Sequence, residues 1–292
     1  MTKQKILGTG LSGLVGSRIV ELLSDKFEFE NLDRKTGIDI TDFETVLDKI
    51  SDSQASTVFH LAAYTDVKGA EEEKELKENS QSWKINVIGT ENVVKACEQT
   101  EKKIIHVSTD LVIGGDNMPE GGFTEDALPN PLSWYAITKH EAEKIIEKIN
   151  SPWLIARIAY PYRASFEKPD FVRFFRDLLK GGKEISVISD RLISPTFIDD
   201  LAFAFEALME KDVTGIFHVV GSQIISLQDA VTMIAENFNL DKSLVKKTTR
   251  EEFLVGRPPE PFSSALSNAK IKQLGINMHT FEEGLHILKL NI

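Results

Sequence analysis

Tyr135 and Lys139 stand four residues apart, in a segment that is predicted to form a helix beginning after Ser133. Side chains at positions i and i+4 lie one above the other on a helix face, so the ammonium group would lie close to the phenol. A positive charge there favours the phenolate and is expected to lower the pKa of Tyr135 toward working pH. A tyrosine tuned in this way can transfer a proton in catalysis. A simple surface pair on a helix is the alternative interpretation.

A glycine-rich turn follows the first predicted strand, residues 5–8, and contains Gly10, Gly13 and Gly16. Apolar residues then recur at helical spacing, so the order is strand, glycine turn, helix, as a dinucleotide-binding loop requires. In such a loop the first glycine makes the tight turn, the second lets backbone approach a pyrophosphate, and the third lets helix pack on strand. We expect the pyrophosphate at the N-terminus of the helix, where unpaired N–H groups attract anions.

Two charged residues end the second predicted strand and point to different cofactors. Asp33 lies at the right distance past the glycines to bond ribose hydroxyls, as an acidic residue there does for NAD. Arg34 could instead receive the 2′-phosphate of NADP, so the preference stays open. Asp39 and Ile40, after a short loop, could contact the adenine, while the alternative for Asp39 is a place near a helix N-cap.

Two later predicted strands end in residues that suit a binding site. Ala62 and Ala63 are small and would let a cofactor come close, since ligands of open α/β sheets bind outside the carboxyl ends of the strands. Thr109, in the stretch 108–110, follows the other strand. Its hydroxyl could meet the same substrate oxygen as Tyr135, or it could merely cap the strand end.

Composition restricts the class of function. With 292 residues the chain can bury a core as one large domain or as two unequal lobes. The formal net charge of −11 argues against a nucleic-acid or anionic-membrane surface, and no apolar run is long enough to span a bilayer. Cys97 has no second cysteine to pair with, and no secretory signal pattern precedes the first strand, so the cytoplasm is the expected location. No metal site is predicted, because Asp199 and Asp200 fit the start of a helix.

Strands and helices alternate through the first half, which predicts an α/β fold with a doubly wound parallel sheet, the Rossmann fold, and a smaller C-terminal lobe. The predicted dinucleotide-binding domain comprises residues 1–160 and 185–220. The predicted substrate-binding lobe comprises residues 161–184 and 221–292, and the cleft between the two is expected to hold the substrate. In this lobe Arg257, on a proline-rich loop, could clamp a diphosphate with two hydrogen bonds or simply face solvent.

Taken together, the glycine turn, the Ser-Thr-Asp stretch and the Tyr-x-x-x-Lys spacing resemble the extended short-chain dehydrogenase/reductase superfamily. Within it the chain is similar to the dTDP-4-dehydrorhamnose reductase family over nearly its whole length. The stretches that carry this similarity are Ala62-Ala63-Tyr64-Thr65, Ser108-Thr109-Asp110, Asn130-Pro131-Leu132, Ser194-Pro195-Thr196 and Arg257-Pro258. The resemblance implies an enzyme that reduces the keto group of a nucleotide-linked 4-keto-6-deoxy sugar with NADPH or NADH.

The resemblance also implies roles for individual residues. Tyr135 would donate the proton, and Lys139 would lower its pKa and hold the nicotinamide ribose. Thr109 would orient the substrate carbonyl, with Asn86 as a supporting residue. The residues implied at the cofactor, besides Tyr135 and Lys139, are Gly10, Gly13, Leu14, Val15, Asp33, Arg34, Asp39, Ile40, Leu61, Ala62, Ala63 and Tyr64. Those implied at the substrate are Asp110, Tyr160 and Arg257.

Several positions near the implied sugar pocket depart from the reductase pattern. Leu111 stands where a tyrosine is usual, Tyr160 stands in place of a tryptophan, and Arg191 replaces a glutamine. Cofactor binding is therefore more firmly predicted than the identity of the sugar. The alternatives are an NAD-dependent nucleotide-sugar epimerase or dehydratase, and a non-catalytic, cofactor-binding regulatory subunit like that of methionine adenosyltransferase. The expected partner is a nucleotide sugar, and a homodimer is possible.

Overall fold

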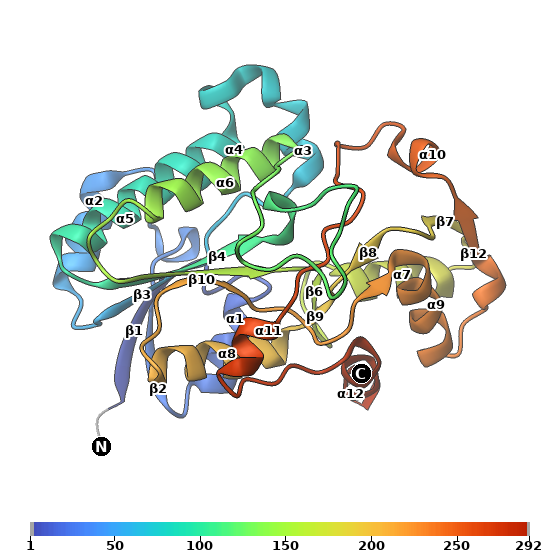
Figure 1. The fold of residues 1–292 in the computed structure, drawn as a ribbon. Helices are drawn as coiled ribbons and strands as arrows, with labels where there is room; N and C mark the ends of the chain where they lie inside the picture. Colours follow the sequence, from blue (N-terminus) through green and yellow to red (C-terminus); the bar gives the residue numbers. More distant parts are fainter. Residues whose placement is uncertain (1–2, 291–292) are drawn as a thin grey trace. The chain divides into compact units, whose positions relative to one another are not determined.

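The computed structural model describes residues 3–290, and its central element is a parallel sheet (Figure 1). Within that range six strands form the sheet, in the order β10-β5-β4-β3-β1-β2. Their bounds are β1 Gln4–Thr9, β2 Phe27–Asn31, β3 Thr57–His60, β4 Lys103–Thr109, β5 Trp153–Ile158 and β10 Gly215–His218. The registers of β1 with β2, of β1 with β3 and of β3 with β4 are parallel, which confirms the predicted doubly wound fold.

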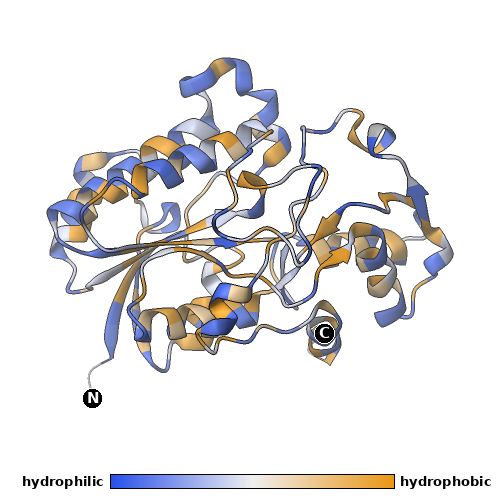
Figure 2. Cartoon of the chain, viewed as in Figure 1, coloured by the Kyte–Doolittle hydropathy of each residue, from blue (hydrophilic) through white to orange (hydrophobic). Residues whose placement is uncertain are grey.

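Helices cover both faces of this sheet. Helices α2 (Phe43–Asp52), α5 (Gly89–Gln99) and α6 (Trp134–Ile146) run along one face, and α1 (Gly16–Leu23) lies on the other (Figure 1). Strand β3 is buried along its whole length and β4 is buried except at Val107, as expected for strands covered on both sides. The apolar character of the strands shows in Figure 2. The core on the α2 and α5 side includes Val46, Ile50, Val58, Val93, Val94 and Ile104.

The strand order reverses beside β1. The chain passes from β1 to β2 on one side and comes back to β3 on the other, so the carboxyl ends of β1 and β3 form a topological switch point. The glycine turn follows β1 at this point and residues 61–64 follow β3. The amide of Leu61 donates to the carbonyl of Thr9 over 3.1 Å. Two segments that are predicted to hold the cofactor are therefore neighbours in space.

The chain divides into two compact units. The first comprises residues 1–112, 131–157 and 208–217, and the second comprises residues 113–130, 158–207 and 218–292. This division differs from the predicted boundaries because 113–130 and 185–207 fall in the second unit. Segment 113–130 makes isolated β-bridges with distant chain, Gly115 with Ser263 and Phe123 with Leu266. The functions assigned to the two parts stay predictions, and the ends of the predicted ranges, 1–2 and 291–292, lie outside the described residues.

The second unit has an apolar core of its own. Helices α7 (Phe171–Lys180), α9 (Leu227–Asn237) and α12 (Phe281–Leu290) contribute to it, together with the parallel pair β7 (Ile185–Ile188) and β12 (Val245–Thr248). Phe171 and Phe175 of α7 pack against this core. The short strands are β6 Pro161–Tyr162, β8 Leu192–Ile193, β9 Thr196–Phe197 and β11 Ile225–Ser226. The remaining α-helices are α3 Val67–Glu72, α4 Gln81–Trp83, α8 Ile198–Glu210, α10 Arg250–Leu254 and α11 Ala269–Gln273. Over the described part of the chain, no helix has the length and apolarity needed to cross a membrane.

Candidate active site

Tyr135 and Thr109 come together from separate elements of the first unit. Thr109 ends β4, and Tyr135 lies in the first turn of α6, whose N-terminus is capped by Ser133 accepting a hydrogen bond from the Ala136 amide over 3.2 Å. The Tyr135 phenol lies close enough to the Thr109 hydroxyl and the Asp110 carboxylate for both to affect its pKa. The Thr109 hydroxyl also donates to Asp110 over 3.1 Å. Two hydroxyls and a carboxylate thus meet at the carboxyl end of β4.

The phenol of Tyr135 is held in its protonated form. Burial raises the pKa of Tyr135 well above its usual value, and the negative charge of Asp110 raises it further, while the Thr109 hydroxyl opposes them. The expectation that Lys139 lowers this pKa was wrong for the protein without ligands. The physical reason is that Tyr135 is only 8% exposed, and a buried phenolate beside a carboxylate is poorly solvated.

Lys139 is anchored to β4 and not to the phenol. Its ammonium donates to the carbonyl of Val107 over 2.9 Å and is hydrogen-bonded to Nε2 of His106, also at 2.9 Å. Burial lowers the pKa of Lys139 to about 8, although the charge of Glu143 acts in the opposite direction. His106 was not among the predicted site residues. The only sequence signal for it is a histidine inside an apolar strand.

A second buried histidine connects the switch point to α5. His60 contacts the Thr9 hydroxyl through Nδ1 at 2.7 Å and the Thr90 hydroxyl through Nε2 at 2.9 Å. Because the Thr90 hydroxyl already donates to the carbonyl of Asn86, it must accept from Nε2–H of His60. Burial lowers the pKa of His60 to about 3, so the ring is neutral at physiological pH. His60 is thus a neutral structural residue.

Asn86 lies in a π-helix, Lys84–Ile88, that interrupts what the sequence predicts as one long helix. Its Oδ1 accepts from the Tyr64 amide over 2.7 Å, and its Nδ2 donates to the Tyr64 carbonyl over 3.2 Å and to the Thr138 hydroxyl over 2.9 Å. The Thr138 hydroxyl donates in turn to the carbonyl of Tyr135. Such π-helical turns are often found at functional sites. Here the turn lets one amide connect the segment after β3 to the helix of Tyr135.

The glycine turn has the shape that a pyrophosphate needs. Gly10 is in the left-handed region at φ 68°, and a Cβ there would lie 2.6 Å from the Ala62 nitrogen. A Cβ on Gly16 would lie 2.5 Å from the Gly10 carbonyl oxygen. Helix α1 begins at Gly16, and no side chain caps the amides at its N-terminus. This closely packed turn at a helix N-terminus without a side-chain cap fits a dinucleotide, and the Leu14 and Val15 backbone lies within it.

Replacing Gly10 by alanine tests this geometry. The substitution is expected to lower the free energy of unfolding by more than about 1–2 kcal/mol, because the strain of the left-handed conformation adds to a clash with backbone. Gly37→Ala is the matched control, since Gly37 has φ 82° and open space where a Cβ would lie. Urea unfolding of both variants measures the difference. Equal losses would mean that the contact between the turn and Ala62 contributes nothing.

The carboxylate of Asp33 is fully hydrogen-bonded to other groups of the protein. Its side chain caps the short 3-10 helix Arg34–Thr36 by accepting from the amides of Lys35 and Thr36, at 2.8 and 3.2 Å. Its other oxygen accepts from Ser12 and, over 2.8 Å, from Asn31. Burial acts to raise the pKa of Asp33, but these hydrogen bonds outweigh it and the pKa is lowered. The four acceptor positions of this carboxylate are thereby filled, whereas Arg34 is exposed.

The two residues predicted at the adenine differ in exposure. Asp39 is exposed, and its carboxylate accepts from the amide and hydroxyl of Thr41, both at 2.9 Å. Ile40 is buried in the core of the first unit, and its side chain lies where a Cβ on Gly89 would be. Its carbonyl accepts from Asn92 over 3.0 Å. Asp39 is therefore the more available of the two for a ligand.

The predicted substrate residues Tyr160 and Arg257 belong to the second unit. Tyr160 adopts φ 44°, an uncommon conformation for a residue other than glycine, and its ring meets Phe171 edge-to-face at 5.2 Å. Arg257 is exposed, with its guanidinium 4.1 Å from the centre of the Phe253 ring. Arg191 lies over the Tyr160 ring at 5.9 Å. The third predicted substrate residue, Asp110, lies instead with Thr109 in the first unit.

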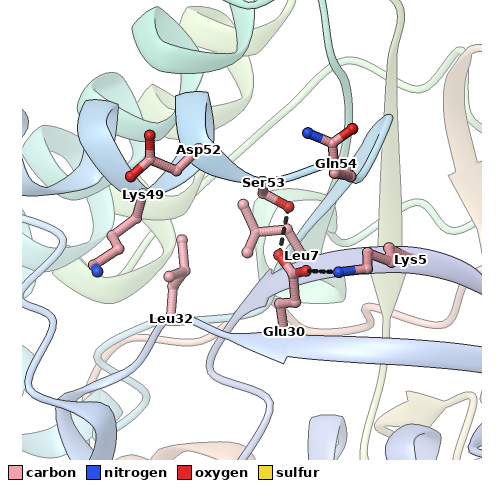
Figure 3. A pocket seen from close by; sticks show the side chains of 8 residues that line it. All are labelled: Lys5, Leu7, Glu30, Leu32, Lys49, Asp52, Ser53 and Gln54. Atoms are coloured by element: carbon pink, nitrogen blue, oxygen red, sulfur yellow. Dashed lines mark hydrogen bonds and ion pairs between the residues drawn. The ribbon is translucent and has the colours of Figure 1, made fainter.

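A surface pocket elsewhere in the first unit contains none of the predicted site residues. It is lined by Lys5, Leu7, Glu30, Leu32, Lys49, Asp52, Ser53 and Gln54 (Figure 3). Glu30 crosses it, pairing with Lys5 at 2.9 Å and accepting from Ser53 at 2.5 Å. Lys5, Glu30 and Ser53 thus satisfy one another. Across residues 3–290, no group of three histidine, cysteine or carboxylate side chains is arranged to hold a metal ion.

Comparison with known proteins agrees with this geometry. The family model described as RmlD substrate binding domain matches residues 4–289. The chain is 27% identical over 296 residues to the probable low-salt glycan biosynthesis reductase Agl14 of Haloferax volcanii, covering 96% of each protein. It is 28% identical over 275 residues to the dTDP-4-dehydrorhamnose reductase of Mycolicibacterium smegmatis, covering 94% of this chain and 81% of the relative. The solved structure of dTDP-4-dehydrorhamnose reductase from Bacillus anthracis in complex with NADP matches with a TM-score of 0.89 and 28% identity, covering 100% of both chains.

Proposed function

Since the chain belongs to the RmlD family within the extended short-chain dehydrogenase/reductase superfamily, we propose that it reduces the 4-keto group of a nucleotide-linked 4-keto-6-deoxy sugar. It is an NAD(P)-dependent oxidoreductase. The observation that carries the proposal is that the buried Tyr135 phenol lies next to Thr109 and Asp110 at the carboxyl end of β4. Tyr135 and Thr109 offer two hydroxyls to a single carbonyl oxygen.

The protonation state of Tyr135 suits reduction. The nicotinamide cofactor, when bound, supplies the hydride that reaches the carbonyl carbon. A carbonyl oxygen that gains negative charge needs a proton, and the raised pKa of Tyr135 keeps its phenol protonated and able to donate. Thr109 would direct the oxygen toward that proton through its own hydroxyl. Lys139, held by Val107 and His106, would present its positive charge next to the nicotinamide ribose.

The assay follows directly from this proposal. Oxidation of NADPH and NADH is measured with a dTDP-4-keto-6-deoxy sugar present, and the sugar product is identified by mass spectrometry. We expect oxidation that depends on the sugar and forms the 4-hydroxy product. A protein that binds the cofactor but turns over neither this sugar nor other nucleotide-linked keto sugars would refute the proposal.

The pKa of Lys139 predicts an alkaline limit to turnover. A lysine with a pKa of about 8 is charged below that pH and neutral above it, so a step that needs the ammonium weakens as pH rises through about 8. We expect kcat/KM to fall about tenfold per pH unit above this value. The pH profile of kcat/KM between pH 6 and 10 measures it. A profile that stays level up to pH 10 would mean that the charge of Lys139 is not required.

The cofactor proposed for this chain is NADPH. The acceptor positions of the Asp33 carboxylate are taken by donors of the protein. Arg34 beside it is exposed, so its guanidinium can bind a 2′-phosphate. Arg34→Ala is expected to raise the KM for NADPH by about 10- to 100-fold, the usual range for losing hydrogen bonds to a charged group. The KM for NADH serves as the internal control and is expected to change little. A parallel rise in both constants would place Arg34 outside the phosphate site.

A regulatory subunit without catalysis is the competing function. It would keep cofactor binding but would not need Tyr135 next to Thr109, so the placement of these two residues favours the enzyme. Turnover of a nucleotide sugar separates the two. A cytoplasmic location and a homodimer stay predictions from the sequence.

A further inference from the structure

Arg191 of the second unit has a buried guanidinium with one edge unpaired. The residue is 3% exposed, and its Nη1 forms an ion pair with Glu260. Among the described residues, nothing accepts a hydrogen bond from its Nε or its Nη2, and both atoms are buried. These two N–H groups lie side by side and point the same way. Their spacing matches the two oxygens of a carboxylate or a phosphate.

Two other buried arginines show what this edge takes in the same chain. Nε and Nη2 of Arg157 donate to the two oxygens of Glu143 over 3.0 and 2.7 Å. Nε of Arg173 donates to Asp170 over 2.8 Å, and its Nη2 donates to the carbonyl of Lys168 over 2.6 Å. Buried donors are normally paired, and an unpaired charged donor is costly. The Nε–Nη2 edge of Arg191 therefore lacks a hydrogen-bond acceptor among the described residues.

The rest of the Arg191 side chain is fixed by its surroundings. The Tyr160 ring lies under the guanidinium at 5.9 Å, and Phe171 supports that ring edge-to-face. The strained φ of Tyr160 indicates that packing dictates its position. At the other end, Glu260 holds Nη1, and the Glu260 carbonyl accepts from Arg250 over 3.2 Å. Arg191 is thus held in one orientation with its Nε–Nη2 edge left for a ligand.

We propose that the Nε–Nη2 edge of Arg191 binds an oxyanion of the substrate, a carboxylate or a phosphate. The inference rests on the proposed function insofar as the ligand is a nucleotide sugar. Such a substrate offers two sources of this chemistry, the diphosphate and an acidic group on the sugar ring. Glu260 lies on the loop after α10 and is more exposed than Arg191, at 22% against 3%. A ligand reaches the buried edge only if that loop moves.

The test compares three probes that differ by one group at a time: dTDP, dTDP-glucose and dTDP-glucuronic acid. Their dissociation constants are measured by calorimetry with the full-length protein and NADPH, for the wild type and for Arg191→Gln. We expect the variant to bind at least one probe about 10- to 100-fold more weakly, as losing two charge-assisted bonds implies. Arg176→Gln is the matched control, because Arg176 is in the same unit and is paired with Asp177.

The pattern of losses identifies the source of the oxyanion. An equal loss for all three probes assigns the edge to the diphosphate, and a loss confined to dTDP-glucuronic acid assigns it to a sugar carboxylate. Unchanged binding of every probe in Arg191→Gln would overturn the proposal, as would a wild-type protein that binds none of them. Binding without turnover of any keto sugar would reject the proposed function and leave this site standing.

Thermal stability separates a binding arginine from a structural one. Arg191→Gln removes two buried donors that have no partner but also the ion pair with the partly exposed Glu260, so the melting temperature of the protein is expected to fall only slightly. Arg157→Gln, which breaks a fully paired edge, is expected to lower it. A fall in Arg191→Gln as large as that in Arg157→Gln would show that Arg191 serves the fold, and would overturn the proposal.

Discussion

Replacing Tyr135 by phenylalanine is expected to reduce kcat by about 100- to 10,000-fold, which is the usual contribution of a positioned general acid. The phenol is protonated and lies next to Thr109, and its ring is already buried, so the substitution removes the proton donor and little packing. The dissociation constant for NADPH is expected to stay within about threefold, because the ring remains and only one hydrogen bond is lost. Steady-state kinetics and cofactor titration measure the two effects.

Tyr162→Phe is the control for this prediction. Tyr162 lies in the second unit, is fully buried, and has a hydroxyl that no group in the described chain bonds. Removing that hydroxyl is expected to preserve kcat and to keep or increase stability, since an unpaired buried hydroxyl is a cost. If Tyr135→Phe kept more than a tenth of the wild-type kcat, another residue would have to be the proton donor.

The second large effect is expected from Glu143→Gln. Glu143 and Arg157 form a buried ion pair at 2.7 Å, with side chains 1% and 2% exposed. The variant leaves the Arg157 charge buried without its counterion, which is expected to lower the free energy of unfolding by about 3–5 kcal/mol at neutral pH. Urea unfolding measures the loss. Glu141→Gln is the control, because its pair with Lys144 is exposed and should contribute no more than about 1 kcal/mol.

The same pair sets a pH dependence of stability. Burial alone would raise the pKa of Glu143, but the neighbouring His140, together with the hydrogen bonds and the charge of Arg157, lowers it from 4.5 to about 2. A lowered pKa in the folded state gives stability that is present above about pH 4.5 and is lost as pH falls toward 2. The wild type should therefore lose more stability than Glu143→Gln over this range. Parallel curves of unfolding free energy against pH for the two proteins would contradict the lowered pKa of Glu143.

Glu143 also affects the site, because it lies on α6, the helix that carries Tyr135 and Lys139. A substitution that loosens this helix would disturb the position of Tyr135. Activity lost in Glu143→Gln should therefore be interpreted together with its stability.

The sequence predicted the elements that local patterns determine. The glycine turn, the parallel sheet and the helix of Tyr135 all follow from spacing and from residue type within short windows. Strand order in a doubly wound sheet restricts where ligands bind, so a binding site at the carboxyl ends of β1 and β3 could also be predicted. These are properties that a window of about 20 residues contains.

What the sequence could not predict depends on contacts between distant residues. The pKa of Tyr135 is set by burial and by Asp110, and not by the lysine one helical turn away. Asp33 carries the right chemistry for a ribose, but Ser12 and Asn31 occupy one of its oxygens. The division into two units depends on pairing such as Gly115 with Ser263, which no local pattern indicates.

The Asn86 side chain holds the backbone of the segment after β3 as a neighbouring strand would. By receiving the amide of Tyr64 and donating to its carbonyl, one side chain supplies both bonds that a neighbouring strand would supply in a ladder. These two bonds extend the hydrogen-bonded edge of the sheet past the end of β3, as far as Tyr64. Through Thr138 the same side chain connects this segment to the helix of Tyr135, so the backbone of Tyr64 and the proton donor are held by one amide.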